Sequence, residues 1–342
     1  MALLLVDGFE GYGTSVGSNY INRFLLRYPN STTSAAVIRD GRYGGYAVDL
    51  YSTSYYAETP PWSGGNPTLV FGFAVRRVGS PIYDAFIAAL YASTSSKIQV
   101  KHIVSSGELE IRVGTTTGTV IGATTGAAIG TDWVYVEVKV YFHDTVGTVD
   151  VYVDGVSRLS VSGADTLSGT SIPDRLRLYS NSTIYLDDLY VLDGSGTRNN
   201  DILGPQKVVA VFPTSDVLSE FTPSTGSDHY ALVDEVAVGR TEEADWVEAS
   251  SAGICDTFGY GDVSDLGPIA GVQLSTIARN EGGSALDMIS RVVSGSTTSD
   301  DAGVECTSSR VDYLRVLEVD PDTTSPWSVS GINSAVFGVK AG

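Results

Sequence analysis

The residue pattern closest to a catalytic pair lies in the second half of the chain. Glu243, Asp245 and Glu248 follow the spacing Glu-x-Asp-x-x-Glu. On a bulged strand, this spacing would place both glutamates on one face as nucleophile and acid/base of a retaining glycosidase, with Asp245 tuning their pKa values. The preceding residues are polar and lack apolar alternation, which favours an acidic loop facing water. We therefore expect no catalysis at Glu243 and Glu248.

Three aspartates near the middle of the chain could bind Ca²⁺. Asp187, Asp188 and Asp193, with Asp7 as a further ligand, offer the hard oxygens that Ca²⁺ prefers. The alternative is that Asp187 and Asp188 mark a strand bulge, where acids prevent pairing with other chains. The second interpretation is favoured, so no cofactor is expected, and Ca²⁺ is kept as an option at these aspartates.

Aromatic residues around a proline-rich loop could contact a sugar ring or another protein subunit. They are Tyr51, Tyr55, Tyr56 and Trp62. Aromatic faces supply the apolar part of such contacts. Packing against the fold or a neighbouring subunit is favoured over glycan binding, because large aromatic side chains tend to be buried.

Other catalytic patterns are missing from the sequence. The histidines His102, His143 and His229 are scattered, and no Gly-x-Ser-x-Gly elbow precedes a helical stretch. The glycine-rich segment Gly41–Gly45 leads into a strand pattern, so a phosphate cradle at a helix N-terminus is not expected.

Charge and composition exclude several classes of protein. The 342 residues carry a net charge of −19, which argues against a nucleic-acid partner, because phosphate binding needs a positive surface. Cys255 and Cys306 are too few for a disulfide framework, and free thiols are favoured over one bridge. No apolar run approaches the roughly 20 residues of a membrane span, and no signal peptide is recognisable. We expect synthesis in the cytoplasm and no membrane partner.

Alternating apolar residues predict strands through most of the first 195 residues. Trp133–Phe142 has the clearest alternation, and Asp154-Gly155 between two alternating runs predicts a hairpin. In Ile184–Asp193 the alternation shifts phase at the two acids, which predicts a bulge. Ile82–Tyr91 fits a short helix or a strand, and its position between strands favours a strand. The expected fold class is all-β.

A polar segment divides the chain into two expected domains. Residues 196–205, which contain Gly-Thr-Arg-Asn-Asn-Asp, are the expected linker between a domain over 1–195 and a β-rich C-terminal domain over 206–342. In the second domain we expect strands in Lys207–Phe212, Pro268–Ala278, Ala285–Val293, Tyr313–Val319 and Ala335–Lys340.

The first domain resembles the concanavalin A-like, or laminin-G-like, jelly roll. The residues that carry the resemblance are the strand Trp133–Phe142, the run Val149–Gly155 and the closing strand Ile184–Asp193. In that family the closing strand commonly lies beside the N-terminal one, here Leu3–Phe9. The resemblance implies a sandwich fold and little about function.

The whole chain is also similar to a class of tailed-phage structural proteins. The similarity rests on Val6–Tyr12, Asn200–Pro205, Asp228–Tyr230, Asp256–Tyr260 and Gly331–Lys340. It implies a non-enzymatic virion component, such as a capsid decoration, fibre or tail-associated protein, that contacts other virion proteins and forms a homo-oligomer. A carbohydrate-binding adhesin that recognises a host surface glycan is the alternative, and a glycosidase is a third hypothesis.

Overall fold

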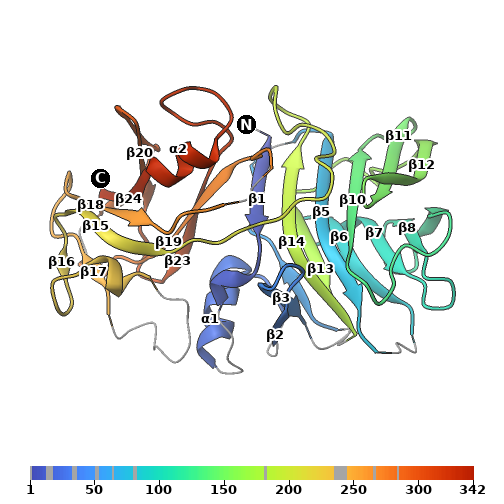
Figure 1. Ribbon diagram of the computed structural model, residues 1–342. Helices are drawn as coiled ribbons and strands as arrows, with labels where there is room; N and C mark the ends of the chain where they lie inside the picture. Colours follow the sequence, from blue (N-terminus) through green and yellow to red (C-terminus); the bar gives the residue numbers. More distant parts are fainter. Residues whose placement is uncertain are drawn as a thin grey trace. The chain divides into compact units, whose positions relative to one another are not determined.

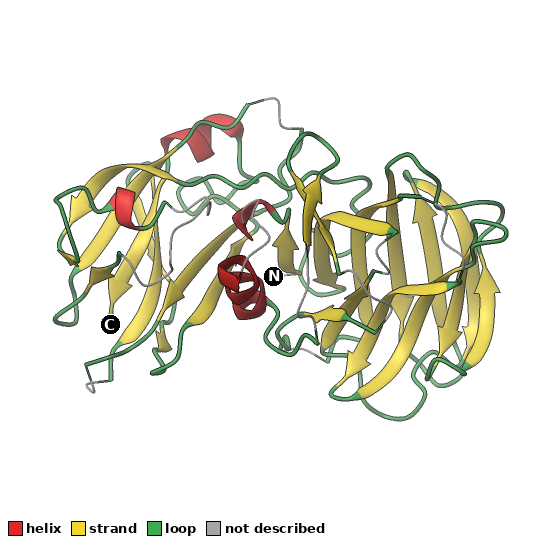
Figure 2. Cartoon of the chain, turned by 90° about the horizontal axis from the view of Figure 1, so that it is seen from below, coloured by secondary structure: helices red, strands yellow, loops and turns green. Residues whose placement is uncertain are grey.

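The protein consists of two compact units, residues Met1–Val209 and Ala210–Gly342. This computed structural model describes residues 2–12, 18–32, 37–50, 54–63, 65–79, 83–180, 183–234, 245–264, 267–282 and 285–342. Within these ranges the regular secondary structure is mainly strands, with a few short helices (Figures 1 and 2), so the expected all-β class is confirmed. Residues 196–205, expected as a linker, lie within the first unit. No helix in the described ranges is long and apolar enough to cross a membrane.

The first unit is a sandwich of two antiparallel sheets. The first sheet has the order β12-β11-β10-β5-β14-β3-β2, with β1 paired to β14. Its strands are β1 (Leu3–Asp7), β2 (Val37–Asp40), β3 (Tyr46–Asp49), β5 (Thr68–Arg77), β10 (Val134–Tyr141), β11 (Gly147–Val153), β12 (Val156–Ala164) and β14 (Ile184–Asp193). The helical segments η1 (Glu10–Tyr12) and α1 (Ser18–Arg27) follow β1.

The second sheet of this unit has the order β4-β13-β6-β7-β8-β9. Its strands are β4 (Tyr56–Glu58), β6 (Ala85–Ala92), β7 (Ser95–His102), β8 (Leu109–Val113), β9 (Thr119–Ala123) and β13 (Arg175–Tyr179). Strands far apart in the sequence are therefore neighbours, because β13 lies between β4 and β6. This order brings residues near positions 57, 90 and 176 side by side.

Alternation along the strands sends one face of each sheet into the core. In β10, Val136, Val138 and Val140 are fully buried, and in β13 the same holds for Leu176 and Leu178. Burying such side chains contributes about 1.5–3 kcal/mol each. The residues that alternate with them on β13 point to the opposite, outer face of the second sheet.

Several sequence predictions for this unit are confirmed. The closing strand β14 pairs with β1, and its register shifts between Asp187 and Tyr190, where Asp188 has φ 50°. Asp154 and Gly155 both have positive φ and join β11 to β12 as a hairpin. The ambiguous segment at residues 82–91 contains the strand β6. The helix α1 was not predicted, because Gly, Ser and Asn around it favoured a loop.

The outer face of the first sheet is covered by residues 201–208. Glu137 accepts hydrogen bonds from the backbone N–H groups of Leu203 (3.1 Å) and Gly204 (2.8 Å). Asp188 accepts one from Val208 at 2.8 Å. Lys207–Phe212, predicted as a strand, is not one: it has no strand partner among the described residues, and the N–H of Val208 donates to a side chain, that of Asp188.

The second unit has a sheet of order β15-β18-β24-β20-β21, with β22 paired to β20, and two smaller ribbons, β16-β17 and β19-β23. Val292, Leu317, Trp327, Ala335 and Phe337 form a core cluster in it. Its elements are β15 (Pro213–Ser219), β16 (Thr222–Pro223), η2 (Tyr230–Leu232), β17 (Val247–Glu248), β18 (Cys255–Tyr260), β19 (Val272–Ala278), β20 (Asp287–Ser294), β21 (Thr297–Asp300), β22 (Val304–Glu305), β23 (Val311–Leu317), α2 (Val329–Ser334) and β24 (Val336–Ala341).

The predicted strands in the second unit other than Lys207–Phe212 are present as β19, β20, β23 and β24. The strand β15 was not predicted from the sequence, because apolar residues alternate only weakly along it; most of its residues are exposed. Cys255 and Cys306 are both free thiols, as favoured from the sequence.

Candidate functional site

A row of side chains crosses the outer face of the second sheet. The strand registers place Glu58 opposite Arg177, Arg177 opposite Ala89, Ala89 opposite Gln99, and Gln99 opposite Arg112. Neighbouring strands lie about 4.8 Å apart, so Arg177 and Gln99 are about 10 Å apart at the backbone. Ala89, the residue between them, has the smallest side chain of the row.

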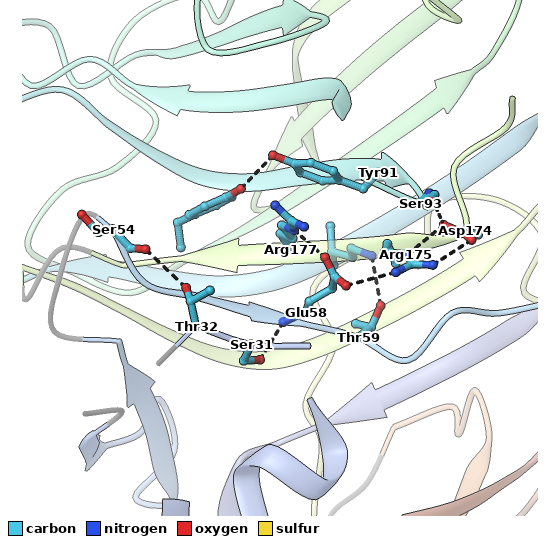
Figure 3. Close-up of polar contacts among 12 residues, drawn as sticks. Ser31, Thr32, Ser54, Glu58, Thr59, Tyr91, Ser93, Asp174, Arg175 and Arg177 are labelled. Atoms are coloured by element: carbon cyan, nitrogen blue, oxygen red, sulfur yellow. Dashed lines mark hydrogen bonds and ion pairs between the residues drawn. The ribbon is translucent and has the colours of Figure 1, made fainter. Parts of the chain in front are cut away.

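Arg177 lies between two tyrosine rings. Its guanidinium carbon is 3.8 Å from the ring centre of Tyr91 and 4.1 Å from that of Tyr56. The hydroxyl groups of Tyr91 and Tyr179 are 3.2 Å apart, and Tyr56 and Tyr179 pack with ring centres 5.9 Å apart. These four residues and Glu58 are called the Arg177 cluster below. Their contacts join β4, β6 and β13, and Figure 3 shows Glu58, Tyr91 and Arg177 of this cluster.

Glu58 holds Arg175 and Arg177 in place by hydrogen bonds. Its side chain is buried, and it accepts hydrogen bonds from Arg177 Nε (2.5 Å) and Arg175 Nη1 (3.2 Å). The paired carboxylate outweighs the opposing effect of burial and raises the pKa of Arg177. Arg175 also binds Asp174 with two hydrogen bonds of 2.9 and 3.1 Å, as Figure 3 shows. Both guanidinium groups are therefore held as cations in one orientation.

Tyr179 is held in its protonated form. Burial, and then the hydrogen bond with Tyr91, raises the pKa of its hydroxyl far above the ordinary value of 10.0. The hydroxyl can therefore donate a hydrogen bond to a ligand at neutral pH, but it does not supply a base.

Gln99 and Lys97 occupy the outer face of β7 beside the cluster. Gln99 is 2% exposed and Lys97 is 4% exposed. The Gln99 amide nitrogen donates to Ser96 Oγ at 2.9 Å, whereas its Oε1 has no hydrogen-bond partner in the described part of the chain. A buried acceptor without a donor costs about 1–3 kcal/mol, so this atom is a position where a ligand donor would be favourable.

Of the four aromatic residues predicted to contact a glycan or a subunit, some lie at this site and one lies outside the described residues. Tyr56 belongs to the Arg177 cluster, and Tyr55 precedes it with a partly buried side chain. The backbone N–H of Trp62 donates to Asp174 at 2.9 Å, so this residue lies at the edge of the same site. Tyr51 lies outside the described residues. The prediction that these residues contact a glycan or a subunit stays a prediction.

The three candidate Ca²⁺ ligands accept hydrogen bonds from backbone N–H groups. Asp187 and Asp193 accept backbone hydrogen bonds from Arg42 (2.7 Å) and Ser195 (2.8 Å), and Asp188 holds Val208. Burial, followed by repulsion from Asp188, raises the pKa of Asp187 to about 7. Within the described ranges no group of three or more His, Cys, Asp or Glu is arranged to hold a metal ion.

The structure does not test the predicted pair of glutamates. Glu243 lies outside the described residues, and Glu248 is exposed on β17, a strand of two residues paired with β16. Asp7, the further Ca²⁺ ligand, instead accepts hydrogen bonds from the hydroxyls of Tyr12 and Tyr28.

Sequence reasoning missed Glu58, Gln99, Arg175 and Arg177. A signal was present in the alternation Arg-Leu-Arg-Leu-Tyr at residues 175–179, where two arginines and a tyrosine share one face. The signal does not show that Glu58 and Tyr91 lie beside these residues, because the neighbours of β13 come from distant parts of the chain.

Comparisons with known proteins show no family for this chain. No family model matches the chain, and no curated protein matches it in sequence. Domain 4 of an arabinanase from Geobacillus stearothermophilus, in complex with arabinotriose, has a TM-score of 0.36 at 15% identity and covers 48% of this chain and 78% of that chain. An endo-β-1,4-glucuronan lyase from Trichoderma reesei has a TM-score of 0.37 at 13% identity, and the match covers 48% of this chain and 90% of that chain. The galectin LEC-6 from Caenorhabditis elegans has a TM-score of 0.29 at 10% identity, and the match covers 39% of this chain and 87% of that chain.

These comparisons correct the expectation of a non-enzymatic protein. Two of the three structures come from enzymes, an arabinanase and a glucuronan lyase, and the third is a galectin. A missing catalytic motif does not exclude catalysis, because function depends on the site built on a fold. None of the three is a phage structural protein, and the phage resemblance stays a prediction.

Proposed function

We propose that the first unit binds a carbohydrate on the outer face of its second sheet, across the Arg177 cluster and Gln99. The observation that carries the proposal is the Oε1 atom of Gln99, a buried acceptor without a donor among the described residues. A sugar hydroxyl is a donor of the right kind, and the cluster lies two strands away on the same face.

The Arg177 cluster supplies the other contacts that a sugar needs. Tyr56 and Tyr179 are partly exposed, and their rings offer apolar faces to the C–H groups of a sugar ring. Arg177 has a fixed guanidinium that can donate to hydroxyl or ring oxygens, because Glu58 and two rings hold it in place. A prearranged donor loses little conformational freedom when the ligand binds.

Arg177→Met tests this proposal, and Arg76→Met is a matched control. Arg76 also stacks on two rings, with its guanidinium carbon 4.9 Å from the ring centre of Trp133 and 5.3 Å from that of Tyr185, but it lies on the first sheet. Wild-type protein is applied to a glycan array, and the affinity for the strongest ligand is measured by calorimetry. We expect Arg177→Met to weaken binding about tenfold or more, which corresponds to about 1.4 kcal/mol, and Arg76→Met to leave it unchanged.

Two results would refute the proposal: wild-type protein that binds no glycan at high concentration, or equal affinities for Arg177→Met and wild type. Melting curves of both variants show whether a loss of binding reflects unfolding. After the titration, the oligosaccharide ligand is recovered and its molecular mass is measured by mass spectrometry. Any cleavage by the wild-type protein is thus detected in the same experiment.

The expected setting of this site, a homo-oligomer on a tailed-phage particle made in the host cytoplasm, also stays a proposal. It is supported by the sequence resemblance stated above. Mass spectrometry of purified particles tests it, since absence of the chain from the virion would remove it.

A further inference from the structure

Lys97 is a buried cation without a carboxylate partner in the described part of the chain. Its Nζ donates to the backbone oxygen of Ser168 at 2.9 Å, and its side chain is almost fully buried. Lys101, Lys139 and Lys340 each pair with an aspartate, at 2.8–3.2 Å. The contrast is notable in a chain with net charge −19, where carboxylates outnumber cations.

An ammonium group in such a position is costly unless an anion compensates it. Burying a charge without a partner costs far more than burying a neutral polar group. One backbone carbonyl satisfies one of the three donors of Nζ, and the other two have no partner among the described residues. An anionic ligand would supply both the missing charge and the missing acceptors.

Lys97 and Gln99 face the same side of β7. The register between β6 and β7 shifts at this point, so that Ser96 pairs with Tyr91 and Lys97 has no opposite residue on β6. Ile98 and Val100 point into the core, and Lys97 and Gln99 therefore point outward, about 7 Å apart at the backbone. The face thus presents an unpaired cation beside an acceptor that lacks a donor.

We propose that the carbohydrate is acidic: its carboxylate binds Nζ of Lys97, and a neighbouring hydroxyl donates to Oε1 of Gln99. The inference rests on the proposed function and specifies its ligand. A uronic acid carries a carboxylate and hydroxyls on one ring, which matches the two unsatisfied groups. Neutral sugars provide the hydroxyl but leave Lys97 without an anion.

The test compares acidic saccharides with their methyl esters, which have the same rings without the charge. Full-length protein is titrated by calorimetry with tetramers of galacturonate, glucuronate and mannuronate and with the esterified forms. We expect at least one acidic tetramer to bind ten or more times more tightly than its ester, and this preference to shrink as salt rises.

Variants on β7 assign the preference to Lys97. Lys97→Met should reduce affinity for the acidic tetramer at least tenfold and leave the ester unaffected. Lys101→Met is the matched control, since it removes the same charge from the same strand and face but from a lysine paired with Asp84. Gln99→Glu keeps the side-chain size, and its negative charge should repel the acidic tetramer more than the ester. Lys97→Gln keeps a donor for Ser168 and serves if Lys97→Met melts early.

The outcomes separate the two proposals. If neutral or esterified saccharides bind as well as the acidic ones, or if Lys97→Met and Lys97→Gln fold and keep the acidic preference, the inference is wrong and the carbohydrate site remains. If no saccharide of any charge binds the wild-type protein, both proposals fall.

Discussion

His102 should make the stability of the first unit depend on pH. It lies on the inner face of β7 with no solvent-exposed surface, and neither ring nitrogen has a hydrogen-bond partner among the described residues. Burial, then the nearby charge of Arg77, lowers its pKa from 6.5 to about 4, while Asp84 opposes the shift. The fold therefore accommodates the neutral ring and resists the protonated one.

The size of the effect follows from the two pKa values. Because the folded pKa of about 4 lies below the unfolded 6.5, this contribution to stability is complete above pH 6.5 and is lost as pH falls toward 4. The full difference corresponds to about 3 kcal/mol, and about 2 kcal/mol of it disappears between pH 7.5 and pH 5. Other groups act in the opposite sense: burial raises the pKa of Glu10 to about 9, so its contribution favours low pH.

The measurement therefore compares variants with wild type at each pH. Urea unfolding of the full chain is followed by hydrogen exchange of the β6–β7 peptides, which reports the first unit separately from the second. His102→Leu should be favoured over wild type by about 2 kcal/mol more at pH 5 than at pH 7.5. Arg77→Met should reduce the pH dependence, because it removes a charge that disfavours protonation. Parallel pH profiles for wild type and His102→Leu would refute the reasoning.

Two further predictions concern buried contacts in each unit. Leu189→Asp should destabilise the first unit by several kcal/mol, because Leu189 is fully buried on β14 and the new charge would have no partner. Leu189→Met, which has a similar volume, should keep the fold. Near-native melting of the aspartate variant would contradict the prediction. Asp256→Ala should lower the free energy of unfolding of the second unit by about 3–5 kcal/mol, because this buried carboxylate binds His229 Nδ1 at 2.6 Å and two backbone N–H groups. Hydrogen exchange of β18 measures the loss of stability. Protection equal to that of wild type would count against the prediction.

The candidate site shows where prediction from sequence stops. Tyr56 was selected because it is aromatic and lies near prolines, but its role depends on Arg177, 121 positions away in the chain. The two meet because β13 is inserted between β4 and β6. Alternation assigns each side chain to a face of its own strand, and it carries no information about which distant strand lies next to it.

The sequence by itself determined the all-β class, the Asp154-Gly155 hairpin and the bulge at Asp187 and Asp188, because each depends on residues close together in the chain. Only the tertiary structure decided that, among the described residues, Lys97 has no carboxylate partner and Gln99 Oε1 has no donor, and that Asp188 binds the backbone of Val208. Hydrogen bonds and charges between distant segments depend on which strands become neighbours, and that follows from packing of the whole sandwich.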